Sequence, residues 1–138
     1  MNRVSSVVRI GLGIVVGVAL GLGVVIAGDT INHALFPPPH LSEWENYVAT
    51  APFAAFIGLP IAYALAAFAA AFAGAKIAAR IWAGWVSGGL LTAATFANLV
   101  MVHHPLWMTI ACIVLVPLAA WFGAKLAAAP ARAQPLTQ

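Results

Sequence analysis

Residues 51–75 read APFAAFIGLPIAYALAAFAAAFAGA, an unbroken run without a charged side chain. A helix needs roughly 20 apolar residues to cross the hydrocarbon core of a bilayer, so this stretch is long enough to span a membrane. Three further stretches pass the same test, at residues 10–28, 81–102 and 105–124. In the last of these, Pro117 predicts a kink and not an end, because neighbouring helices can satisfy the carbonyl that a proline frees. The sequence therefore predicts four spanning helices in one membrane domain.

The composition of the whole chain agrees with a membrane protein. Of its 138 residues, 64% are hydrophobic and only 7% are charged, and the mean hydropathy is +1.02. Soluble domains have about 45–50% apolar and about 25% charged residues, so these few charges could not keep a water-facing surface hydrated. The net charge of +3 is dispersed, with no basic cluster to follow a phosphate backbone. We therefore exclude a soluble globular enzyme, a disordered chain and a nucleic-acid-binding module.

The charged residues are segregated along the chain in a way that predicts the topology. All six basic residues flank the same ends of the spans, and they are Arg3, Arg9, Lys76, Arg80, Lys125 and Arg132. The loop of residues 29–50 between the first two spans holds all three acidic residues and no Lys or Arg. Because Lys and Arg favour the cytoplasmic side, we expect both termini in the cytoplasm, including the tail of residues 128–138. Both hairpin loops would then lie on the outer side.

The first span has a second interpretation, as a cleaved signal peptide. A basic start, an apolar core and small residues before Gly28 are features of such peptides. However, the apolar run is longer than the roughly 7–15 residues of a signal-peptide core. It also carries Gly13, Gly17 and Gly21 at four-residue spacing, a helix-packing pattern that a discarded peptide does not need. We therefore expect this span to be retained.

Small residues recur at intervals of four in every span, a spacing typical of closely packed membrane helices. The glycines in this pattern are Gly13, Gly17, Gly21, Gly74, Gly84, Gly88 and Gly123. We expect a compact bundle, with further small-residue faces available for a homo-oligomer. The segment GAKIAA at residues 74–79 also recurs as GAKLAA at residues 123–128. This suggests two helical hairpins repeated about an axis along the membrane normal, with coincidence in a biased composition as the alternative.

The loop of residues 29–50 has features of its own. Three consecutive prolines at residues 37–39 predict a stiff extended stretch. Ser42 precedes Glu45 by three residues, which is the spacing of a capping box at the start of a helix. We therefore expect a short helix at residues 43–49, lying at the outer membrane interface.

Histidines and carboxylates gather on the predicted outer side. Asp29 and His33 would share a helix face if the first helix continued by a turn or two, and His104 lies in the other outer loop. Together such groups can bind a divalent metal or relay protons, so these three are the candidate metal ligands. The sequence has no recognisable metal-ligand spacing, and ordinary loop polarity is the alternative. It also has no nucleophile elbow or phosphate-binding loop, so we assign no catalytic residue and no cofactor.

The spans contain few polar side chains, of which the deepest are Tyr63, Thr92, Thr95 and Asn98. We expect them to form hydrogen bonds between helices, with a permeation path as the alternative. No charged residue or histidine lies near the middle of a span. Intramembrane ionisable groups are typical of proton-coupled transporters, so their absence counts against a proton-driven pump.

Two segments of the chain resemble a group of small, uncharacterised four-helix integral membrane proteins of bacteria. They are NHALFPPP at residues 32–39 and ANLVMVHHPLW at residues 97–107. The resemblance implies a bacterial inner-membrane location and a four-helix shape, without an activity, and it draws attention to His33, Asn98, His104 and Trp107. An acidic residue is expected late in the first helix of such a protein, whereas this chain has Asp29 several positions nearer the loop.

The sequence thus predicts an all-α, four-helix transmembrane bundle, and two functions fit it. The first is a non-enzymatic accessory or packing subunit that contacts the lipid bilayer and binds a larger membrane complex or further copies of itself. The alternative is a small oligomeric transporter or channel, with the outer histidines and carboxylates at its mouth. A membrane enzyme ranks third, because no plausible catalytic groups are present.

Overall fold

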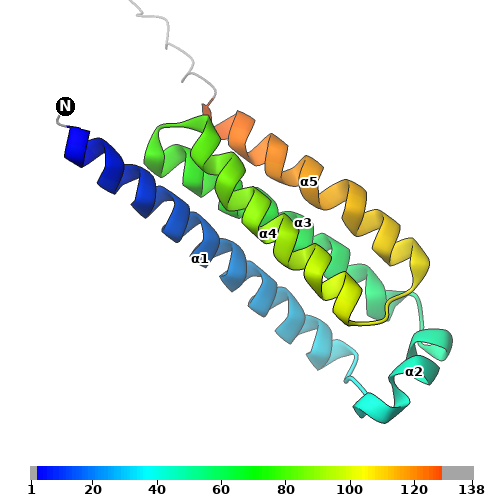
Figure 1. The fold of residues 1–138 in the computed structure, drawn as a ribbon. Coiled ribbons are helices and arrows are strands. Elements are labelled where there is room, and N and C mark those ends of the chain that lie inside the picture. Colours follow the sequence, from blue (N-terminus) through cyan, green and yellow to red (C-terminus); the bar gives the residue numbers. More distant parts are fainter. Residues whose placement is uncertain (1–2, 129–138) are drawn as a thin grey trace, which may run out of the picture.

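The computed structural model describes residues 3–128 of the chain. Four long helices lie side by side, and they are α1 (Arg3–Leu35), α3 (Ala54–Ala78), α4 (Ile81–Met101) and α5 (Leu106–Ala128) (Figure 1). Between α1 and α3 the chain forms a 3₁₀ turn, η1 (Leu41–Glu43), and a short helix, α2 (Trp44–Thr50). Each long helix is apolar and long enough to cross a membrane. The structure confirms the all-α four-helix bundle. The tail predicted at residues 128–138 lies, beyond Ala128, outside the described residues.

The helix α1 continues through residues that the hydropathy pattern assigned to the outer loop, and it ends at Leu35. No residue between 29 and 35 interrupts a helix, and the first proline of the chain is Pro37. A residue that precedes a proline is disfavoured in helical conformation, so the helix ends just before Phe36. The loop predicted at residues 29–50 is therefore helical over its first part, because apolarity marks the membrane-spanning part of a helix and not its end.

The short helix forms, but the capping box predicted for Ser42 does not. Neither η1 nor α2 has a side-chain hydrogen bond at its N-cap. The chain already begins to turn at Leu41, so Ser42 lies inside η1 and cannot occupy the cap position. The helix α2 ends at Thr50, before Pro52, as its sequence predicted.

The two central helices of the bundle are α3 and α4. Each of them contacts the other three long helices, whereas over residues 3–128 α1 and α5 do not contact each other. In a parallel repeat, a twofold rotation would place α1 on α4 and α3 on α5. The contact between α3 and α4 would then need an equivalent contact between α5 and α1, which is absent over residues 3–128. The repeated segments at residues 74–79 and 123–128 therefore end two helices that do not occupy equivalent places in the bundle, contrary to the symmetry that the repeat suggested.

The packing glycines let helix backbones approach closely. A Cβ added at any of the seven glycines of the four-residue pattern would meet atoms of a neighbouring helix, whereas one added at Gly11 or Gly23 would have nothing within 4 Å. The buried centre of α3 consists largely of alanines, among them Ala67, Ala70 and Ala71, which are fully buried. Close backbone contact thus supplies much of the packing between α1, α3 and α4. That α1 is retained stays a prediction, which the intact mass of the purified protein tests.

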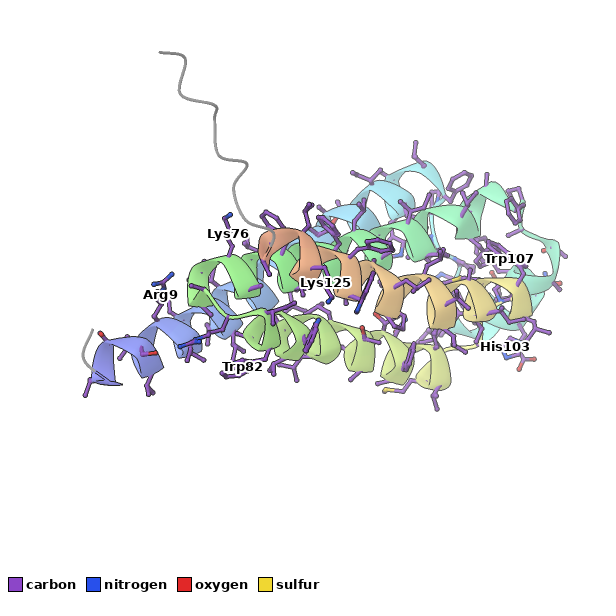
Figure 2. The ribbon with its side chains drawn as sticks, turned by 90° about the horizontal axis from the view of Figure 1, so that it is seen from above. Arg9, Lys76, Trp82, His103, Trp107 and Lys125 are labelled. Atoms are coloured by element: carbon purple, nitrogen blue, oxygen red, sulfur yellow. The ribbon has the colours of Figure 1, made fainter. Side chains whose placement is uncertain are left out.

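The two ends of the bundle differ in charge. Arg9, Lys76 and Lys125 lie at one end, and His103 and Trp107 lie at the other (Figure 2). We call the first the basic end, where Arg80 also lies, as the N-cap residue of α4. We call the second the loop end, where η1, α2 and the turn between α4 and α5 lie, and where the three acidic residues are found. The segregation of charge along the sequence is therefore also a segregation in space.

Candidate functional site

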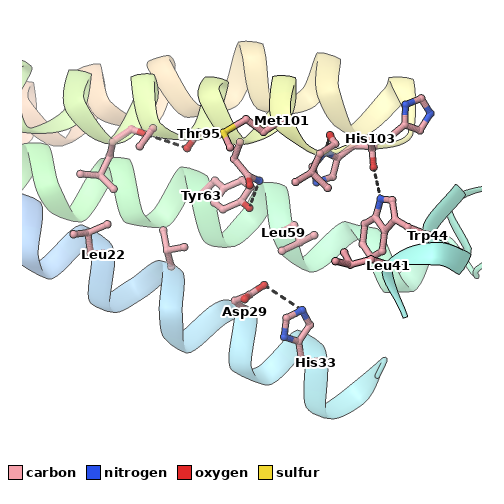
Figure 3. Close-up of a pocket in the computed structure, with 16 residues that line it drawn as sticks. Leu22, Asp29, His33, Leu41, Trp44, Leu59, Tyr63, Thr95, Met101 and His103 are labelled. Atoms are coloured by element: carbon pink, nitrogen blue, oxygen red, sulfur yellow. Dashed lines mark hydrogen bonds and ion pairs between the residues drawn. The ribbon is translucent and has the colours of Figure 1, made fainter. Parts of the chain in front are cut away.

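At the loop end the bundle opens into a cleft. Its two walls are α1 and α4, and α3 forms its base (Figure 3). The cleft has a volume of about 650 Å³. Most of its lining is apolar, with side chains that include Leu22, Val25, Leu41, Leu59, Leu91, Ala94 and Met101. The polar residues of the lining are Asp29, His33, Tyr63, Thr95, Asn98, His103 and His104. The structure thus gathers into one cleft nearly all the polar residues that the sequence singled out separately.

The cleft forms because α1 stays close to α3 but separates from α4 towards the loop end. A Cβ at Gly21 would lie 2.9 Å both from Ala66 O of α3 and from Leu91 Cγ of α4. One at Gly28 would meet only Ala62 of α3. Leu91 is 3% exposed and lies beside the deepest part of the cleft. The close packing at Gly21 therefore ends the cleft on the side of the basic end.

Asp29 and His33 lie one helical turn apart on the wall that α1 contributes. His33 Nε2 is 3.6 Å from Asp29 Oδ1, and the side chains are 48% and 45% exposed. This is the shared face that their spacing predicts for a continued helix. The contact is an ion pair only when the imidazole is protonated, and at this distance and exposure it is a weak one.

His104 lies in the turn between α4 and α5, outside the helices. Its Nδ1 is 2.6 Å from Val102 O, so the imidazole N–H at this position donates to that carbonyl. Burial lowers the pKa of His104 below its ordinary value, and the neighbouring His103 lowers it further, against the opposing effect of the bond to Val102 O. The neutral imidazole is thus the form that this turn favours.

The candidate metal ligands share the cleft without forming a metal centre. Asp29 and His33 are paired, whereas His104 is bonded to its own turn. Within residues 3–128 no group of three His, Cys, Asp or Glu side chains is arranged to hold a metal ion. Structural and catalytic zinc sites in proteins use three or four protein ligands, so the pair on α1 alone offers too few.

Two of the four intramembrane polar residues form the expected bond between helices. Asn98 Nδ2 of α4 donates to Tyr63 OH of α3 at 3.0 Å, inside the cleft. Thr92 and Thr95 do not, because each hydroxyl donates at 2.9 Å to the carbonyl four residues earlier in its own helix. A threonine in a helix always has that carbonyl within reach, whereas a partner on another helix needs a matching position.

The segment η1–α2 contributes Leu41 and Trp44 to the lining of the cleft, and it is held there by a contact that no sequence motif indicates. Trp44 Nε1 donates to His103 O at 2.7 Å, which joins α2 to the turn between α4 and α5. The ring of Tyr47 lies 5.8 Å from that of Phe56 between centroids, so α2 also packs against α3. Trp44 and His103 are 59 positions apart in the chain, so only the fold reveals that Trp44 belongs to this site.

The two segments that resemble small bacterial membrane proteins both lie at this end of the bundle. From the first, His33 lines the cleft, and Asn32 Nδ2 donates to Ala55 O of α3 at 3.1 Å. From the second, Asn98 and both histidines line it. Trp107 lies outside the lining, where its ring packs 4.4 Å from that of Phe53 between centroids.

The chain matches no family model, and searches of curated proteins and of solved structures return no significant match. The helical, membrane-spanning layout is consistent with the resemblance drawn from the two segments. Four apolar helices of spanning length indicate a membrane-embedded protein.

Proposed function

We propose that the chain is a small multi-pass protein of a bacterial inner membrane that acts without catalysis, as an accessory subunit whose cleft holds a small ligand. The cleft between α1 and α4 is the observation that carries the proposal. Ligand sites are concave and mostly apolar, with a few polar groups, and have volumes of about 300–1,000 Å³. The cleft, at about 650 Å³, has this size and this mixture of side chains.

The charge of the two ends supports an orientation with the cleft facing outward. Lys and Arg favour the cytoplasmic side, so the basic end and both termini would lie in the cytoplasm and the loop end outside. Cysteine labelling on intact cells tests this in a Cys112→Ala background. An impermeant maleimide should label Ser42→Cys, whereas Ala128→Cys should react only after the cells are permeabilised. The reverse pattern would contradict the orientation.

The close packing of α1 on α3 beyond the cleft favours a binding subunit over a channel through one copy. The cleft ends at Leu22 and Leu91, and beyond them Gly17 and Gly13 hold α1 against the backbone of α3. A continuous path would require α1 to move away from α3. Purification from native membranes should therefore recover the protein with a partner at fixed stoichiometry or as an oligomer of its own. A lone monomer that conducts protons or divalent metal in liposomes would instead support the alternative, a transporter.

Cysteine reactivity along α4 tests whether the cleft is open to a ligand from water. Ala94 lines the cleft, whereas its neighbour Ala93 is similarly exposed but lies outside the lining. A thiol reacts with maleimide as the thiolate, which forms only where water reaches it. In purified protein lacking Cys112, Ala94→Cys should react much faster than Ala93→Cys. Equal, slow reaction of both variants would refute a ligand-accessible cleft.

A further inference from the structure

Among the described residues, those that line the cleft include one carboxylate and no basic side chain other than histidine. Of the described residues that line it, Asp29 alone is acidic, and none is Lys or Arg. With its histidines neutral, the cleft therefore has a negative charge within largely apolar walls. Such walls strengthen attraction for a cation and disfavour an anion.

Among the described residues, the one possible cationic partner of Asp29 is His33, and the contact between them is weak and displaceable. His33 Nε2 is 3.6 Å from Asp29 Oδ1, and both side chains are about half exposed. A neutral imidazole leaves the carboxylate without a positive partner. The other titratable side chains in the lining are Tyr63, His103 and His104, and no Lys or Arg is among the described residues that line the cleft. A ligand's positive charge can therefore take the place beside Asp29.

The rest of the lining suits an apolar body with aromatic contacts. Leu22, Val25 and Leu59 lie along the walls, and Trp44 and Tyr63 add aromatic rings. The bond from Trp44 Nε1 to His103 O holds the indole at the end of the cleft. Aromatic rings attract cations through their electron-rich faces, which adds to the attraction of a nearby carboxylate.

We infer that the ligand of this cleft is an amphipathic organic cation, with its charge beside Asp29 and its apolar body between α1 and α4. This inference rests on the proposed binding role of the cleft and adds the chemical class of the ligand.

Equilibrium binding of tetraphenylphosphonium tests the ligand class. The full chain is placed in phosphatidylcholine nanodiscs at about pH 8, where histidines are neutral, and binding to empty nanodiscs is subtracted. Tetraphenylborate, an anion of the same shape, is the matched probe. Saturable binding of the phosphonium and none of the borate is expected. Asp29→Asn should weaken phosphonium binding roughly tenfold.

The control variant is Glu45→Gln, which removes a carboxylate from the loop end outside the cleft lining. It should leave the affinity nearly unchanged. The melting temperature and the reactivity of Ala94→Cys, measured in the Asp29→Asn protein, show whether its cleft is intact.

Equal phosphonium affinity in the wild type and an intact Asp29→Asn protein would overturn the inference, as would saturable binding of the borate. If Ala94→Cys reacts but the phosphonium does not bind, the ligand class is wrong while the proposed function stands. If Ala94→Cys is unreactive as well, both fail.

Discussion

Replacing Gly17 by alanine adds one methyl group at the point where α1 meets both α3 and α4. The new Cβ would lie 2.6 Å from Ala70 O and 3.0 Å from both Gly74 N and Ser87 Oγ. Ordinary contacts of a Cβ begin at 3.4 Å, so α1 would have to move about 0.8 Å away from α3. Two of the three opposing atoms belong to the backbone, so no side-chain rotation relieves the overlap.

The cost of this movement exceeds the gain in helix propensity. A gap of about 0.5–1 Å forfeits a quarter to a half of the dispersion energy between two surfaces. Overpacked sites typically lose about 1–3 kcal/mol of stability. Alanine is favoured over glycine in a helix by about 1 kcal/mol at most, which offsets only part of that loss. We expect Gly17→Ala to lower the free energy of unfolding by roughly 1–2 kcal/mol.

Gly23→Ala is the matched control, because it makes the same chemical change on the same helix with nothing within 4 Å of the new Cβ. Unfolding of both variants in mixed micelles, driven by dodecyl sulfate and followed by circular dichroism, measures the difference. Gly23→Ala should be neutral or slightly stabilising. If the two variants have the same free energy of unfolding, close contact at Gly17 does not hold α1 in place and the reasoning fails.

Three further predictions concern the polar groups of the loop end. Asn98→Leu should lower the free energy of unfolding by about 0.6 kcal/mol, the average for a hydrogen bond between membrane helices. Combining it with Tyr63→Phe should lower the free energy of unfolding little further, because the two side chains share one hydrogen bond. If the losses of the two single variants add up in the double variant, the shared bond does not contribute as expected. Burial lowers the pKa of His104 from 6.5, so protonation favours the unfolded chain, and the melting temperature should fall as the pH drops below 6.5. His104→Gln should flatten that dependence, and an unchanged slope would exclude His104 as its source. Calorimetric titration with zinc should give equal heats for the wild type and for a variant combining Asp29→Asn, His33→Ala and His104→Ala; a loss of heat in the variant would reveal a metal site.

The class of the protein follows from local properties of the chain. A span is recognised by its length and apolarity alone, because the bilayer demands both of each helix separately. The four spans were predictable for that reason. The short helix before Pro52 was predicted instead from a capping box at Ser42, which does not form. The ends of the helices were harder to predict, because hydropathy does not indicate where a helix stops. It is the proline after Phe36 that ends α1.

The site was predictable in its residues but not in its assembly. Asp29 and His33 belong to one helix, so their spacing alone predicts their contact. Tyr63 and Asn98 belong to different helices, so the sequence does not pair them. Asn98 bonds to α3 whereas Thr95 bonds to its own helix, and their positions in the sequence do not indicate this difference. Trp44 carried no signal of its contact with the turn at His103.

Composition and the order of charged residues thus sufficed to predict a four-helix membrane bundle with two ends of unlike charge, since both follow from what each segment must do in a bilayer. The place of each helix did not follow, because four-residue glycine spacing identifies a packing face without naming its partner. Packing put α3 and α4 at the centre, removed the symmetry of the repeat, and parted α1 from α4 towards the loop end. That separation creates the cleft, because the distance between two helices depends on side chains from both.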